Sequence, residues 1–91
     1  MNKSEFIAEV AEKAGATNAI AQKIINAAIE TIEEKVSSGE RVVFVGFGTF
    51  EKVSRAARMG RNPATGAEMK IPASNIPKFS PGAVFKNKVN S

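Results

Sequence analysis

The chain has 91 residues, with no cysteine and no histidine, and carries a formal net charge of +4. This length suits one small domain, and the missing side chains exclude a disulfide framework, a thiolate metal site and catalysis by a histidine base. Residues 1–40 hold four Lys against seven Glu, whereas residues 41–91 hold nine Lys and Arg against two Glu. A basic half of this kind predicts a polyanionic partner, the alternative being a basic surface that is merely solvated.

Two helices are predicted in the acidic half. Asn2 and Glu5 form a capping box, and the apolar residues that follow at helical spacing predict a first helix near residues 3–14. A second apolar stripe, from Ile20 to Val36, predicts a longer helix with Glu residues on its opposite side. The short connection between them predicts a helical hairpin.

The pattern then changes to short β-branched and aromatic runs. Residues 41–45 and 49–53 predict two strands, and the glycines of residues 46–48 predict the turn that joins them into a hairpin. The second strand is expected to continue to Arg58. In a regular strand Arg55 and Arg61 would share a face that Arg58 does not. Either the ribbon twists or bulges there, or Arg58 contacts the polyanionic partner from a side, and the sequence leaves both open.

A polar tip and a return path follow. The run Gly60–Gly66 is typical of a hairpin tip, and residues 67–79 lead back from it. Pro72 and Pro77 lack the N–H that a central strand needs, so both are expected at an edge or outside a ladder. Ser80–Pro81 predicts the cap and first residue of a last short helix.

Surplus apolar residues predict a second copy of the chain. Residues 51–74 are polar, and the other 67 residues hold all six Phe and most of the Ile and Val. A body this small is marginal alone, so we expect an obligate homodimer, the alternative being a monomer that packs its Phe internally. Two-fold symmetry would duplicate the basic extension. The expected shared core comprises Phe47, Phe50, Phe79, Ile29 and Ile32.

Three segments carry a resemblance to a known family. Val45–Glu51, Ala56–Gly66 and Ile71–Ser74 resemble the bacterial histone-like HU family, which includes integration host factor, and the similarity covers essentially the whole chain. The resemblance implies an α+β fold: a two-helix base, a three-stranded antiparallel sheet with a long β-ribbon arm, a short C-terminal helix, and an intertwined homodimer.

The same resemblance implies a division of the chain. Residues 1–91 would form one DNA-binding domain, with a body of residues 1–50 and 75–91 and an arm of residues 51–74. Val53 and Ala83 stand where many members of the family are basic, and Lys52 is a partial replacement for the first of these positions. Phosphate contacts at those two points are therefore expected to be fewer.

The tip is where the implied chemistry is concentrated. By resemblance, Pro63 is the apolar wedge that enters the minor groove and kinks the duplex, whereas from the residues alone it would only shape the turn. Arg61 and Asn62 flank it, and both suit the narrow minor groove. For any one of these cations, the alternative interpretation is a solvated charge that keeps an exposed ribbon from aggregating. The expected DNA-binding residues are Arg55, Arg58, Arg61, Asn62, Pro63, Lys70, Lys78, Lys86 and Lys3.

The expected function is that of an architectural DNA-binding protein, largely sequence-independent, which bends and compacts DNA in the bacterial nucleoid and prefers bent or nicked duplexes. A site-specific bender of the integration host factor type is the first alternative, and a scaffold that grips an acidic protein is the second. No enzyme activity, cofactor, metal or small-molecule substrate is expected, because no nucleophile–base pair or metal cluster is visible. No secretion signal or membrane-spanning run is recognisable, so a cytoplasmic protein is expected.

Overall fold

The computed structural model describes all 91 residues, which form two compact units, residues 1–34 and residues 35–91. Three helices and antiparallel strands make up the chain, so the predicted α+β class is confirmed. None of the helices is both long enough and apolar enough to cross a membrane.

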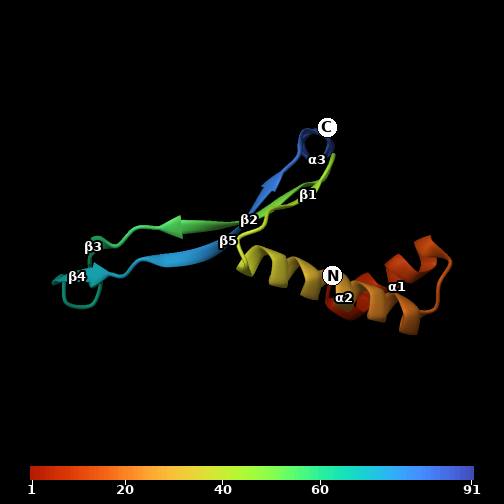
Figure 1. Cartoon of the computed structure of the whole chain (residues 1–91), viewed down its shortest axis with the longest axis horizontal. Coiled ribbons are helices and arrows are strands. Elements are labelled where there is room, and N and C mark those ends of the chain that lie inside the picture. Colours follow the sequence, from red (N-terminus) through yellow and green to blue (C-terminus); the bar gives the residue numbers. More distant parts are fainter. The chain divides into compact units, whose positions relative to one another are not determined.

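The first unit is a helical hairpin (Figure 1). Helix α1 (Lys3–Ala14) begins where the Asn2 side chain accepts the Glu5 N–H at 2.9 Å, and helix α2 (Asn18–Ser37) begins beside the Thr17 hydroxyl. Its core is small: Ile7, Ala11 and Ala21 are buried, with Ile25 packed against them. Both helices confirm the expectation from capping and periodicity.

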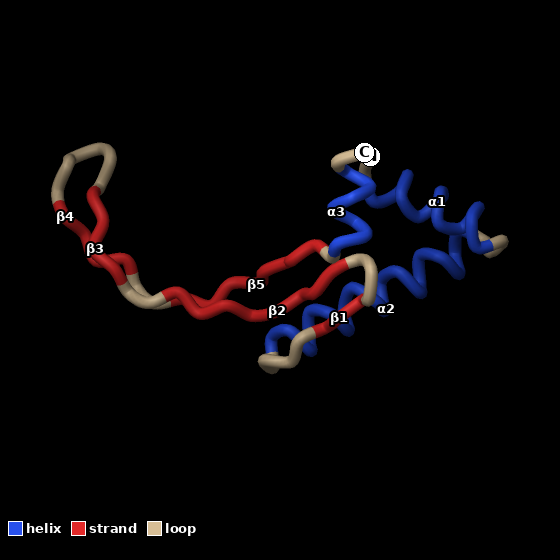
Figure 2. Tube along the Cα trace, turned by 90° about the horizontal axis from the view of Figure 1, so that it is seen from above, coloured by secondary structure: helices blue, strands red, loops and turns tan.

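The second unit is built on a three-stranded antiparallel sheet in the order β1-β2-β5 (Figure 2). Its strands are β1 (Val42–Phe44), β2 (Gly48–Arg55) and β5 (Ser74–Pro81). Gly48 is required at the start of β2, because a Cβ there would lie 2.5 Å from the Phe79 ring and 2.7 Å from the Ser80 carbonyl oxygen.

An aromatic cluster forms the apolar part of this unit. Phe50 and Phe79 lie opposite each other on β2 and β5, with ring centroids 4.8 Å apart. Helix α3 (Ala83–Val89) adds Phe85, whose ring stacks on Phe47 at 5.4 Å. Phe44 completes the cluster from β1.

The prediction for the start of the last helix is wrong. Ser80 and Pro81 are the last residues of β5, and α3 begins after Gly82, which caps it without a side-chain hydrogen bond. The ladder with β2 continues to the end of β5, and the Gly82 N–H donates to the Phe47 carbonyl at 2.8 Å. Pairing across the sheet therefore prevails over the local preference of Ser-Pro for a helix start.

Beyond the body, the two long strands continue as a two-stranded ribbon, β3 (Arg58–Arg61) and β4 (Glu68–Ile71). Short segments without strand structure separate this ribbon from β2 and β5, and its direction changes there (Figure 2). Pro72 lies in one of these segments and Pro77 on the edge strand β5, as their missing N–H groups require.

Candidate nucleic-acid interface

The ribbon keeps one register across its interruption. Arg55 lies opposite Ser74, and Arg58 lies opposite Ile71, so two residues on each strand separate the two ladders. A β-bulge adds a residue to one strand only. The equal count on both strands excludes a bulge, which was one of the two ways expected to bring Arg58 to the face of Arg55.

Hydrogen-bonded and non-hydrogen-bonded pairs alternate along an antiparallel ladder, and each kind places its side chains on one face. In the body, the bond from Gly82 to Phe47 marks a hydrogen-bonded pair one step before β2. Counting along the ladder by twos makes Arg55 and Ser74 a hydrogen-bonded pair as well. The aromatic pair Phe50 and Phe79 is then non-hydrogen-bonded, in keeping with its close rings.

The alternation is shifted in the ribbon. At its end, the Asn62 N–H donates to the carbonyl of Ala67, the residue opposite, at 2.8 Å. Pairs of the same kind recur at every second position, so Gly60 with Met69 and Arg58 with Ile71 are hydrogen-bonded pairs as well. Arg58 therefore lies on the same face of the strand pair as Arg55, a question that the sequence had left open.

Two further observations agree with this assignment of faces. Arg55 and Arg58 line one hollow of about 390 Å³ at the interruption, together with Pro72, Ser74 and other residues of both strands. The Ile71 side chain lies over Gly60, where a Cβ would be 2.7 Å from its Cδ1 atom. The expected pair of cations is thus brought together in a concave surface whose floor is partly apolar.

The opposite face of the ribbon carries Arg61 and Lys70. Arg61 lies opposite Glu68 and Lys70 opposite Met59. Arg61 and Glu68 nevertheless form no ion pair. The one salt bridge of the chain joins Arg41 to Glu51 at 3.2 Å. Arg55, Arg58, Arg61 and Lys70 are exposed and without carboxylate partners, which leaves them available to an external polyanion.

Asn62 organises the tip. Its Oδ1 accepts the Ala64 N–H at 2.9 Å, and its backbone carbonyl accepts the Gly66 N–H at 2.7 Å. Gly66 has φ 72°, a conformation that glycine adopts most readily. Pro63 is exposed between these bonds and contributes none of them. The turn is thus held by Asn62, and its side-chain oxygen is already occupied.

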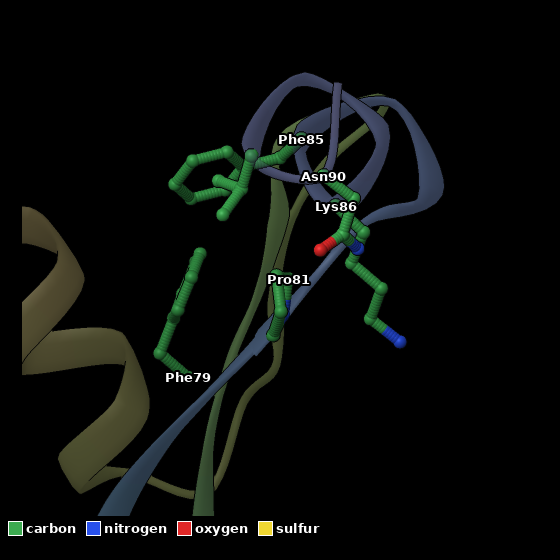
Figure 3. Close-up of a pocket in the computed structure, with 6 residues that line it drawn as sticks. Phe79, Pro81, Phe85, Lys86 and Asn90 are labelled. Atoms are coloured by element: carbon green, nitrogen blue, oxygen red, sulfur yellow. The ribbon is translucent and has the colours of Figure 1, made fainter.

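The remaining expected cations lie elsewhere. Lys78 is exposed on β5 opposite Glu51, and Lys3 is exposed at the start of α1, in the first unit. Lys86 on α3 borders an apolar hollow of about 220 Å³ beside Phe79 and Phe85, and its ammonium group points away from both rings (Figure 3). Lys3 therefore belongs to the first unit, and Lys78 and Lys86 belong to the body of the second.

Lys52 has a role that sequence reasoning missed. Its Nζ donates to the carbonyl oxygen of Ser37 at 3.2 Å, in the last turn of α2. A cation at this end of a helix satisfies an orphan carbonyl and complements the helix dipole. The sequence interpretation of Lys52 as a replacement for a basic residue at Val53 does not anticipate this contact, which no local pattern signals.

The expected dimer-core residues are incompletely buried in the single chain. Phe47 is 47% exposed and Ile29 is 45% exposed, while Phe50, Phe79 and Ile32 are half-buried. The buried hydrophobic residues of the whole chain are Ile7, Ala11, Ala21 and Val36. Large apolar side chains are therefore exposed in each of the two units.

The model of the family described as bacterial DNA-binding protein matches residues 1–90. DNA-binding protein HU of Nostoc sp. is 53% identical over 89 residues, 98% of this chain and 95% of the relative, and that of Clostridium pasteurianum is 50% identical over 99% of each chain. Among solved structures, Anabaena HU crystallised with DNA is 53% identical, with a TM-score of 0.93 over 98% of this chain and 97% of that one. HU of Thermotoga maritima is 37% identical, with a TM-score of 0.69 over 98% of each chain.

Proposed function

Because this chain belongs to the bacterial DNA-binding protein family, we propose that it is an HU-type architectural DNA-binding protein. The observation that carries the proposal is the match over nearly the full length to a protein solved together with DNA. Four unpaired cations, three on the exposed ribbon and Arg55 at its base, supply the positive surface that a polyanion requires. The family is one of DNA-binding proteins and not of enzymes.

The arm, residues 51–74, enters the minor groove in this proposal, and the rest of the chain forms the body. Pro63 is the wedge: its ring is apolar and exposed, and Pro63 makes none of the hydrogen bonds that close the turn. Unstacking one base step costs a few kcal/mol, which contacts along the bent duplex offset. Arg61 and Lys70 lie on one face of the ribbon and reach the groove and its rim.

Arg55 and Arg58 have a different task. They border the same hollow at the base of the ribbon, and a phosphate group between two guanidinium groups makes charge-assisted hydrogen bonds with both. These contacts fix the position of the arm on the duplex and carry no sequence information. Lys3, Lys78 and Lys86 contact the flanks of the bent DNA from the body.

Asn62 contributes mainly through its NH₂ group, because its side-chain oxygen already accepts the Ala64 N–H and is held in the turn. A donor at this point suits the acceptors that every base pair presents in the minor groove, adenine N3 and thymine O2 among them. Such a contact adds affinity with little discrimination, and deformability of the duplex then decides where the protein binds. Bent, nicked or flexible DNA is therefore preferred.

Two copies of the chain form an intertwined homodimer in this proposal. The half-exposed Phe47 and Ile29, with Phe50, Phe79 and Ile32, supply the shared core that the single chain lacks. Each of these side chains that becomes fully buried contributes about 1.5–3 kcal/mol. Sedimentation at micromolar concentration is expected to give a dimer, and a folded monomer at that concentration would contradict the shared core.

The experiment that tests the function is a gel-shift series with intact, nicked and pre-bent duplexes of one sequence at several salt concentrations. Nicked and pre-bent DNA should bind more tightly than intact DNA, and scrambling the sequence should leave the order unchanged. Absence of binding at low salt would overturn the proposal. A sharp preference for one sequence would instead identify a site-specific bender.

The proposed function also implies a location. A protein that bends and compacts DNA without sequence preference is associated with the nucleoid in the bacterial cytoplasm.

A further inference from the structure

The two prolines of the returning strand have opposite relations to its partner. Pro77 lies in β5 opposite Lys52, and the alternation set by the Gly82–Phe47 bond makes that pair non-hydrogen-bonded. The Pro77 nitrogen therefore faces outward from the edge strand, where no N–H is needed. This position accommodates proline without loss of a ladder bond.

Pro72 is an odd number of residues from Pro77. If the alternation of the body continued, Pro72 and Ala57 would form a hydrogen-bonded pair, which requires an N–H that proline lacks. The ladder in fact stops after Arg55 and Ser74. It resumes at Arg58 and Ile71 with the alternation shifted by one residue, so that no ladder bond to Pro72 is required.

We propose that Pro72 is a positioning residue that forces this shift and thereby turns Arg58 to the face of Arg55. Without the shift, regular alternation would place Arg58 on the opposite face, away from the shared hollow. Pro72 lines that hollow itself, beside both arginines. The shift in alternation is inferred from the strand register and backbone hydrogen bonds of the chain itself. Only its consequence for DNA binding rests on the proposed function.

The structural step is tested by NMR on the free protein. In a non-hydrogen-bonded pair the two Cα atoms approach to about 4.5 Å, which gives a strong contact between the Hα protons. In the natural chain this contact is expected between Met59 and Lys70. In Pro72→Ala it should move to Arg58 and Ile71, because the restored N–H permits regular alternation.

Pro77→Ala is the matched control. It removes a proline from the same strand, but at a position whose nitrogen already faces outward, so the contact should remain between Met59 and Lys70. Contacts between Phe50 and Phe79 report in every variant that the body is folded, and Pro72→Val repeats the test with a strong strand former. A contact that stays at Met59 and Lys70 in both Pro72 variants would overturn the inference.

The consequence for DNA is measured as the slope of log affinity against log salt. Pro72→Ala should lower the slope by about one, equivalent to a roughly fourfold smaller loss of affinity between 50 and 200 mM salt. Adding Arg58→Ala to Pro72→Ala should change the slope no further, whereas Arg58→Ala alone should lower it by about one. Additive slopes would contradict positioning of Arg58 through Pro72. Failure of the natural protein to bind DNA would refute the function but leave the NMR result intact.

Discussion

The body sheet and the arm ribbon are made from the same two runs of chain in one register, yet they are specified by different forces. In the body, side chains decide the geometry: Gly48 admits the Phe79 ring, and Phe50 packs against it. In the ribbon, the backbone decides it, through Pro72 and the hydrogen bonds of Asn62. Stability and function are therefore expected to separate between the two regions.

The largest expected effect is on the body. Phe79→Ala removes the ring that contacts Phe47, Phe50 and Phe85, and truncations of this kind cost about 3–5 kcal/mol. Ile71→Ala in the ribbon is the matched truncation and should cost below about 1 kcal/mol, since it is only half-buried. Chemical denaturation of both variants at equal protein concentration measures the difference. Similar losses would mean that the ribbon is part of the cooperative core.

A pair of glycines sharpens the comparison. Gly48→Ala places a Cβ against the Phe79 ring and the Ser80 backbone, which cannot move aside, and should destabilise by about 1–3 kcal/mol. Gly60→Ala meets only the flexible end of the Ile71 side chain and should stay within about 0.5 kcal/mol. Thermal unfolding distinguishes them. A larger effect at Gly60 would contradict the view that side-chain packing governs the body alone.

A smaller effect separates two lysines. Lys52→Met removes the ammonium group bonded to the Ser37 carbonyl at the end of α2 and should cost about 0.3–1 kcal/mol, less at high salt. Lys70→Met in the ribbon should leave the unfolding free energy unchanged but weaken DNA binding. If both variants lose equal stability, the contact of Lys52 with the helix end contributes nothing specific.

Local and long-range signals account for what the sequence could predict. The capping of α1 by Asn2 depends on residues within one turn, and its bounds follow from the sequence alone. The start of α3 does not, because Ser80 is held by pairing with Thr49, a residue remote in sequence. The face of Arg58 was left open by the sequence, although the odd spacing between Pro72 and Pro77 is a signal of the shifted ladder that can be counted there.

A functional change at the tip is expected with little change in stability. Pro63→Ala should alter the unfolding free energy by less than about 0.5 kcal/mol, because Pro63 is exposed and the tip is closed by Asn62. DNA bending, measured by fluorescence energy transfer, should fall more than affinity, because the wedge is lost while the cations remain. Asn62→Ala is the control that loosens the turn, and it should raise amide exchange at Gly66, which Pro63→Ala should leave protected. Equal bending by Pro63→Ala and the natural protein would reduce Pro63 to a turn residue, and a loss of Gly66 protection in Pro63→Ala would show that this proline, too, is needed to hold the turn.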